Sequence, residues 1–194
     1  MGKIILAVSM EKVILSVVIA IAVLIFLIIL SIIIYNVIRT WRIGKMYSDC
    51  DKVLQSLINP TLVNEYRIER ITSKDPYDYI FKTPNHNYYI QVVPNFNSYE
   101  ICINNSVKWQ IRKSFNDNSM NFVPNVDKLM RLDLEDPKSR KLYIIYPNAT
   151  SLLKYINECE MVFVRPETDV YGTNVISYAG LKEKPELFDK IDKI

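Results

Sequence analysis

Cysteine and histidine, the side chains that most often serve as nucleophiles or metal ligands, are few and scattered in this chain. Cys50, Cys102 and Cys159 lie far apart and form no C-x-x-C pair, so their spacing indicates neither a zinc site nor a redox pair. His86 is the only histidine and falls in a polar loop, where we expect it to be solvated. It therefore provides no convincing base for catalysis of the Ser-His-Asp or Cys-His kind. No Walker A, G-x-G-x-x-G or H-E-x-x-H pattern occurs either.

Asp78 and Gln91 lie on two consecutive segments that we expect to be strands, Tyr77–Phe81 and Tyr88–Val93. Over residues 47 to 165, this arrangement and the expected order of elements resemble the restriction-endonuclease-like fold of the PD-(D/E)xK nucleases. In that family an Asp at the start of one strand binds a divalent metal. A Glu or Gln two residues before a Lys, on the paired strand, completes the site. The resemblance implies that Asp78 is a metal ligand and catalytic residue and that Gln91 is its partner.

The match to the family pattern is incomplete, because Val93 stands where the family has its lysine. Lys108, on a later expected strand, would replace that lysine if it reached the same pocket. Such a site would hydrolyse a phosphodiester with Mg²⁺, which prefers oxygen ligands, but one carboxylate and one amide make a weak ligand set. The alternative is that Asp78 caps a turn and Gln91 faces outward from a strand. A fold member that lost catalysis and was kept for binding is a further interpretation.

An apolar stretch without charge, Pro or Gly runs from Val13 to Ile38. About 20 apolar residues in a helix cross the hydrocarbon core of a bilayer, so we expect a single transmembrane helix rather than a cleaved signal peptide. Arg39, Arg42 and Lys45 follow the stretch, whereas Lys3 and Lys12 precede it. The small excess of positive charge on the C-terminal side favours a cytoplasmic location for the rest of the chain.

Charge and cysteine content limit the function classes that remain. Five of the 24 basic residues and one of the 21 acidic residues precede residue 46, so the remainder carries 19 basic and 20 acidic residues. A nearly neutral domain lacks the broad basic surface of most nucleic-acid-binding proteins, which makes nucleic acid an unfavourable partner. Cysteines without evident partners are typical of a reducing compartment and agree with the cytoplasmic orientation.

The hydrophobic periodicity after the anchor predicts both helices and strands. Gly44 permits a break, an amphipathic helix follows from Tyr47 to Ile58, and Thr61–Ile71 fits either a helix or a strand. The segments Tyr77–Phe81, Tyr88–Val93, 99–104 and 107–112 should form an antiparallel meander of three or four strands. We expect further helices at 125–132, capped by Asn125, and at 149–156, and further strands at Leu142–Tyr146, Met161–Val164 and Asn174–Tyr178.

These patterns predict an α+β protein. It consists of a single N-terminal transmembrane helix and one α/β-sandwich-like domain with a largely antiparallel, mixed sheet. The resemblance implies a restriction-endonuclease-like arrangement of this sheet. The expected divisions are an N-terminal flank (1–12), the transmembrane helix (13–38), a basic juxtamembrane linker (39–46), the globular domain (47–180) and a polar C-terminal tail (181–194). The favoured function is a non-catalytic cytoplasmic interaction domain at the cell membrane, whose partners are the lipid bilayer and another protein and which needs no cofactor. The alternative is a degenerate, magnesium-dependent nuclease.

Overall fold

The structure is a computed structural model of the whole chain, and it describes residues 2–58, 65–71, 75–113, 121–157 and 160–192. Side chains are described from residue 13 onward within these ranges, except that of Lys190. The chain divides into two compact units, Met1–Lys45 and Met46–Ile194. Each unit is considered by itself.

Helix α1 (Gly2–Ser56) contains the first unit and continues into the second. From Val13 onward it is long and apolar enough to cross a membrane, and its most apolar stretch is not buried within the protein. Two hydroxyls in this stretch return to the helix backbone: Ser16 donates to Val13 O and Ser31 to Leu27 O. These two hydroxyls are therefore satisfied within the helix, without water. The break that Gly44 permits is absent, because the helix passes through it.

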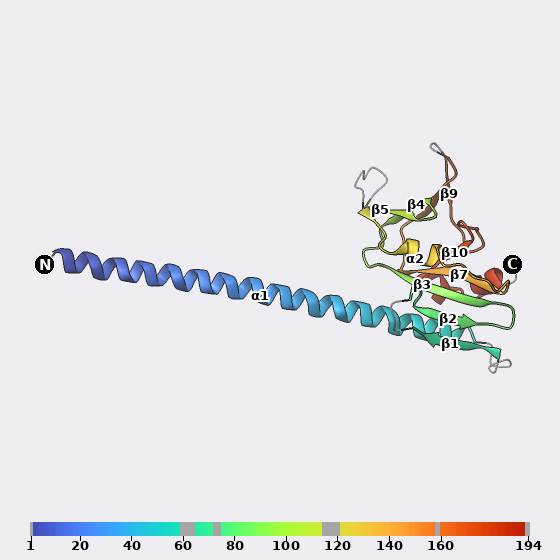
Figure 1. Cartoon of the computed structure of the whole chain (residues 1–194), viewed down its shortest axis with the longest axis horizontal. Coiled ribbons are helices and arrows are strands. Elements are labelled where there is room, and N and C mark those ends of the chain that lie inside the picture. Colours follow the sequence, from blue (N-terminus) through green and yellow to red (C-terminus); the bar gives the residue numbers. More distant parts are fainter. Residues whose placement is uncertain (1, 59–64, 72–74, 114–120, 158–159, 193–194) are drawn as a thin grey trace. The chain divides into compact units, whose positions relative to one another are not determined.

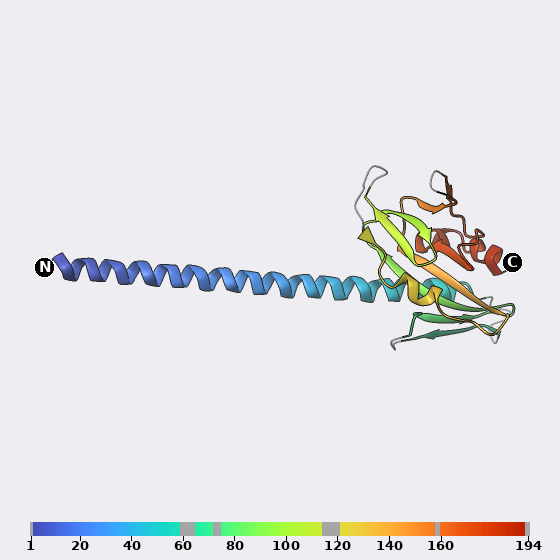
Figure 2. The same cartoon turned by 45° about the horizontal axis from the view of Figure 1, so that its top comes forward.

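The second unit contains two mixed five-stranded sheets (Figures 1 and 2). The first sheet has the order β1 (Arg67–Arg70), β2 (Tyr79–Lys82), β3 (Asn87–Asn95), β7 (Ser139–Pro147) and β10 (Thr173–Ser177). The second has the order β6 (Asn121–Phe122), β5 (Lys108–Arg112), β4 (Glu100–Asn105), β8 (Leu152–Tyr155) and β9 (Met161–Phe163). The short helices are α2 (Val126–Met130), α3 (Tyr178–Glu183) and α4 (Glu186–Asp192).

Strand β7 is an interior strand of the first sheet, covered on both faces as its continuous apolar run predicted. It lies parallel to β3 on one side and to β10 on the other. Its residues from Leu142 to Tyr146 are all buried, so both faces of the strand are covered. Strands β2 and β3 pair antiparallel, with Tyr79 opposite Ile90. The α+β class is therefore confirmed, as are the antiparallel pairs β2–β3 and β4–β5.

The expected single meander is wrong, because the chain changes sheets between β3 and β4. Asn95 is buried at the end of β3, and its amide donates to Tyr99 O at 2.8 Å and to Asn148 O at 2.9 Å. Its Oδ1 accepts the Tyr99 N–H at 3.1 Å. These bonds use the polar groups that a continuing ladder would have satisfied, and β4 pairs with β5 and β8 instead.

The helix expected at residues 149–156 is also wrong. Residues Leu152–Tyr155 form β8, which pairs parallel with β4 and antiparallel with β9. The spacing of apolar residues resembled that of a helix because Leu152 and Leu153 face opposite sides of the sheet and each packs against other side chains. Leu152 contacts the core between the sheets, and Leu153 is 7% exposed on the other face. Tertiary packing overrode the local helical pattern.

Two layers of buried side chains hold the second unit together. One lies between the sheets and includes Trp109 and Tyr143, whose ring centroids are 4.6 Å apart. The other covers the opposite face of the first sheet, where Phe188 of α4 packs on Phe81 and Tyr88 at centroid distances of 5.5 and 5.0 Å. The segment expected as a polar tail thus carries buried apolar residues and completes the core. These residues are Leu181, Phe188 and Ile191.

Candidate binding pocket at the open edge of strand β3

A pocket exists at the edge of β3 because its partner β2 is shorter. Strand β2 pairs only with residues 87–90, whereas β3 continues to Asn95. At the point where β2 stops, the Asp78 N–H donates to Ile90 O at 2.7 Å, and the Asp78 carboxylate accepts the Val92 N–H at 2.7 Å. A side chain thus continues the ladder for one residue. The space beyond it is a pocket of about 240 Å³, lined by Tyr47, Asp75, Pro76, Tyr77, Asp78, Gln91, Val92, Pro94, Pro124, Asn125 and Lys128.

The Asp78 carboxylate links the turn before β2 to strand β3 and to helix α1. Its Oδ2 takes the Val92 N–H of β3, and its Oδ1 accepts the Tyr47 hydroxyl of α1 at 2.8 Å. Burial raises the pKa of Asp78, while the Val92 N–H and the Tyr47 hydroxyl act in the opposite direction. Burial and the neighbouring Asp78 also raise the pKa of Tyr47. The Arg70 guanidinium lies over the Tyr47 ring, 4.4 Å from its centroid. Asp78 is therefore anchored by the fold and still lines the pocket.

Gln91 ties β3 to the start of α2. Its Nε2 donates to Asn125 O at 3.2 Å, which fixes the orientation of the amide. Its Oε1 is buried and accepts no hydrogen bond from the described residues. Asn125 stands at the N-cap of α2 as expected, but with a left-handed backbone (φ 60°) and without a side-chain capping bond. The carbonyl, rather than the side chain, of this residue is what organises the pocket wall.

The sequence-predicted residues come together only in part. Asp78 and Gln91 line one pocket, but Lys108 lies exposed on β5 of the second sheet and does not line it. The basic residue of the pocket is Lys128, one helical turn after Asn125. Sequence reasoning missed it, although its i+3 spacing from the expected cap places both residues on one side of α2. Among the described residues, no group of three or more His, Cys, Asp or Glu is arranged to hold a metal ion.

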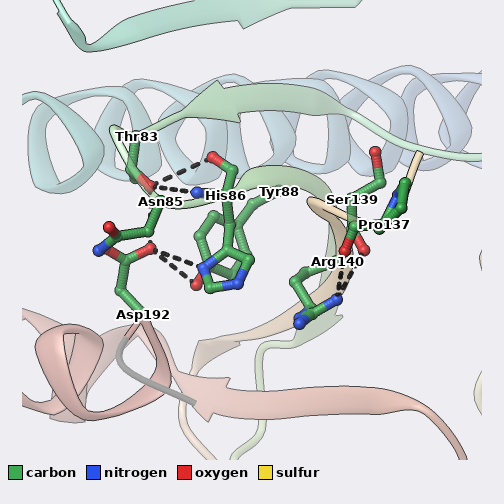
Figure 3. A network of polar contacts seen from close by, with 8 residues as sticks. All are labelled: Thr83, Asn85, His86, Tyr88, Pro137, Ser139, Arg140 and Asp192. Atoms are coloured by element: carbon green, nitrogen blue, oxygen red, sulfur yellow. Dashed lines mark hydrogen bonds and ion pairs between the residues drawn. The ribbon is translucent and has the colours of Figure 1, made fainter.

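His86 is not the solvated loop residue that the sequence suggested, since its side chain is only 14% exposed. It belongs to a set of side chains around the Asp192 carboxylate, shown in Figure 3. His86 Nδ1 lies 3.4 Å from Asp192 Oδ1, which also accepts the hydroxyls of Thr83 at 2.9 Å and Tyr88 at 3.0 Å. Asn85 donates to Oδ2 at 2.8 Å. This network fastens α4 to the loop between β2 and β3, and we assign it a structural role.

The outer face of the second sheet carries a row of side chains that crosses all five strands, which we call the outer row. Its members are Phe122, Gln110, Cys102, Leu153 and Phe163, which lie opposite one another in the strand register. Side chains alternate along a strand, and Ile101, Ile103 and Trp109 face the core, so the outer row faces away from it. Phe163 is 73% exposed and Phe122 is 46% exposed.

A buried ion pair lies next to the outer row. Arg112 Nη2 is 2.6 Å from Glu100 Oε1, and Ser151 donates to Glu100 Oε2. Burial acts to raise the pKa of Glu100, but the bonds from Ser151 and Arg112 outweigh it and lower the pKa. Cys102 is buried in the same region, and burial raises its pKa to about 11.

Cys50, on α1, is buried in the core, and burial raises its pKa to about 12. Both described cysteines are free and poorly suited to reaction as thiolates. Cys159 lies outside the described residues.

Comparison with known proteins gave no match to a family model, a curated protein or a solved structure. The resemblance to the restriction-endonuclease-like fold stays a prediction. Strand β3 lies between β2 and β7 in the first sheet. Helices cover one face of this sheet, and the second sheet with α2 covers the other.

Proposed function

We propose that this chain is a single-pass membrane protein whose second unit is a non-catalytic interaction domain on the cytoplasmic side. The observation that carries the proposal is the outer row, which places two exposed phenylalanines on opposite edge strands of one sheet. Aromatic side chains are enriched at protein interfaces, and these two lie on one face of the sheet, where a single partner can contact both. The partner is a protein that presents an apolar surface to this face.

The roles of Asp78 and the basic juxtamembrane residues agree with this proposal. Both oxygens of the Asp78 carboxylate accept hydrogen bonds from the domain itself. Arg39, Arg42 and Lys45 follow the apolar part of α1 and favour a cytoplasmic domain. A domain held at a membrane meets partners there at a raised effective concentration.

Site-specific photocrosslinking in intact membranes tests the proposal. A benzophenone amino acid is placed at Phe163 or Phe122, and at Lys82, an exposed residue of β2, as the matched control. We expect a protein adduct of one defined mass at both outer-row positions and none at the control. Phe163→Asp should remove the Phe122 adduct without lowering the unfolding midpoint, since Phe163 is exposed. Equal adducts at all three positions, or none at Phe122 and Phe163, would refute the proposed face.

A degenerate nuclease is the second candidate, because Asp78 and Gln91 line one pocket that also contains Lys128. Mg²⁺ held there by Asp78 would polarise a phosphate, with Lys128 in place of the missing family lysine. Incubation of the full chain with DNA and RNA in Mg²⁺ or Mn²⁺ tests this. Cleavage that Asp78→Asn and Lys128→Gln both abolish, and that Lys108→Gln leaves unchanged, supports it. Cleavage unaffected by Asp78→Asn would assign the activity elsewhere.

A further inference from the structure

The pocket at the edge of β3 offers several hydrogen-bond acceptors. In an antiparallel ladder a residue directs its N–H and its C=O to the same side, so the Val92 C=O faces the pocket as its N–H does. The Asp78 carboxylate accepts one bond on each oxygen and keeps further lone pairs available. The Gln91 Oε1 is a further acceptor without a partner among the described residues, although the bond from Nε2 to Asn125 O holds it buried. Such a set favours a ligand that donates several hydrogen bonds.

The charges of these residues favour a cationic donor. Burial disfavours the charged form of Asp78, and Arg70 is near enough to act in the opposite direction on its pKa but forms no ion pair with it among the described residues. A cation beside a desolvated carboxylate is more strongly attracted than one in water. The rings of Tyr47 and Tyr77 line the same pocket, and aromatic rings add attraction for an ammonium group.

Lys128 adds a positive charge on the α2 side of the pocket. It is exposed, and its ammonium forms no ion pair among the described residues, while Asp75 and Asp78 come from the turn before β2. The pocket is thus acidic on one wall and basic on another. A simple cation would use only the first wall, whereas a molecule with both charges would use both.

The size of the pocket limits the ligand. Its volume of about 240 Å³ corresponds to roughly eight waters at about 30 Å³ each. We infer that the pocket binds a small zwitterion with a primary ammonium, the class of the free α-amino acids. The ammonium contacts Asp78 and the Val92 carbonyl, and the carboxylate contacts Lys128. This binding is independent of the protein partner and needs no metal.

The test uses the full chain in lipid nanodiscs and saturation-transfer NMR with each of the common L-amino acids in turn. The best binder is then compared with two matched fragments, the amine without the carboxylate and the acid without the amine. For L-valine these are 2-methylpropylamine and 3-methylbutanoate. We expect the amino acid to bind best, the amine more weakly and the acid not at all.

Two variants on the surface of the pocket separate this site from others. Lys128→Gln should lower the affinity for the amino acid about fivefold and leave that for the amine unchanged, since only the carboxylate loses its partner. Lys108→Gln, the same change on the second sheet, should alter neither. Asp78→Asn, which keeps the shape of the side chain, should weaken both ligands.

Several results would overturn the inference. They are binding of no amino acid at millimolar concentration, equal binding of the acid, and equal effects of the two lysine variants. Displacement of the amino acid by MgCl₂ but not by KCl at equal ionic strength would point instead to a metal site.

Discussion

The Asp78 carboxylate should stabilise the domain measurably if its role is to join α1 to β3. Asp78→Ala removes the acceptor of the Tyr47 hydroxyl and of the Val92 N–H, which lie 2.8 and 2.7 Å from it. Val92 is 5% exposed, but its N–H faces the pocket, so a water there would replace part of the lost bond. A hydrogen bond to a charged group contributes about 1.5–3 kcal/mol, and an unsatisfied buried donor costs about 1–3 kcal/mol. The buried carboxylate itself carries a desolvation cost, which the raised pKa reflects and which offsets part of the loss. We therefore expect Asp78→Ala to lower the free energy of unfolding by about 3 kcal/mol.

A double-mutant cycle isolates the bond between Asp78 and Tyr47. Tyr47→Phe should cost about 1–2 kcal/mol, and the two changes together should cost less than their sum by about 1.5 kcal/mol. Unfolding in urea is followed by the fluorescence of Trp109, which is fully buried, in a Trp41→Phe background that removes the only other tryptophan.

Glu167→Ala, at an exposed carboxylate, is the matched control and should cost less than about 0.5 kcal/mol. If Asp78→Ala costs no more than this control, or if the cycle shows no coupling, the carboxylate is not needed by the fold. The two hydrogen bonds that Asp78 accepts within the domain would then be no argument against a metal-binding role.

Three further predictions concern the ion pair, the C-terminal helix and the topology. Glu100→Gln should cost about 3 kcal/mol at pH 7 because it removes the negative charge that compensates the buried Arg112 guanidinium. The folded pKa of Glu100 is lowered from 4.5, so its contribution to the free energy of unfolding is present above pH 4.5 and is lost as the pH falls through the folded pKa. The urea midpoints of variant and parent should therefore converge in acid. Asp192→Ala should cost about 2 kcal/mol, as it leaves the Thr83 and Tyr88 hydroxyls without an acceptor, and limited proteolysis should then cut near α4; protection equal to the parent would contradict this. For topology, a cysteine introduced by Lys82→Cys should react with an impermeant maleimide only after the membrane is opened, and reaction in intact cells would place the domain outside. The two native buried thiols are unsuitable for this assay, because burial raises their pKa values to about 12 and about 11.

Local patterns correctly predicted the elements in which the spacing of apolar residues matches the repeat of the helix or strand that forms. The apolar run before Arg39 is helical, Leu142–Tyr146 forms the interior strand β7, and the alternation around Ile101 and Trp109 gives β4 and β5. In each case the pattern of apolar residues reflects the surroundings of that element alone. A single sequence is sufficient for such assignments.

Pairing between distant segments was not predictable in the same way. Whether β4 joined β3 or β8 depended on Asn95, whose amide bonds Asn148 more than fifty residues away. The burial of His86 depended on Asp192, which lies 106 residues later. Polar residues in loops look alike in sequence whether solvent or another segment satisfies them. Only the fold distinguishes the two.

The candidate site was predicted in its acidic half and missed in its basic half. Asp78 and Gln91 were identified by strand position, and neighbouring strands bring them to one pocket. Lys128 comes from α2, whose approach to β3 depends on the bond between Gln91 and the Asn125 carbonyl. A family pattern that expects lysine on a strand gives no reason to search a helix. The family pattern therefore favoured Lys108, which lies on a strand.

The network around Asp192 has a consequence for the order of events during synthesis. Thr83 must wait for a partner that lies 109 residues further along the chain, and at about 5–20 residues per second a ribosome needs roughly 5–20 s to add them. Through that interval Phe81 and Tyr88 lack the aromatic cover that Phe188 later supplies. The nascent hairpin is thus exposed to misassociation after the apolar helix has left the ribosome. A chaperone that shields this surface would have its largest effect on the yield of the protein during that period.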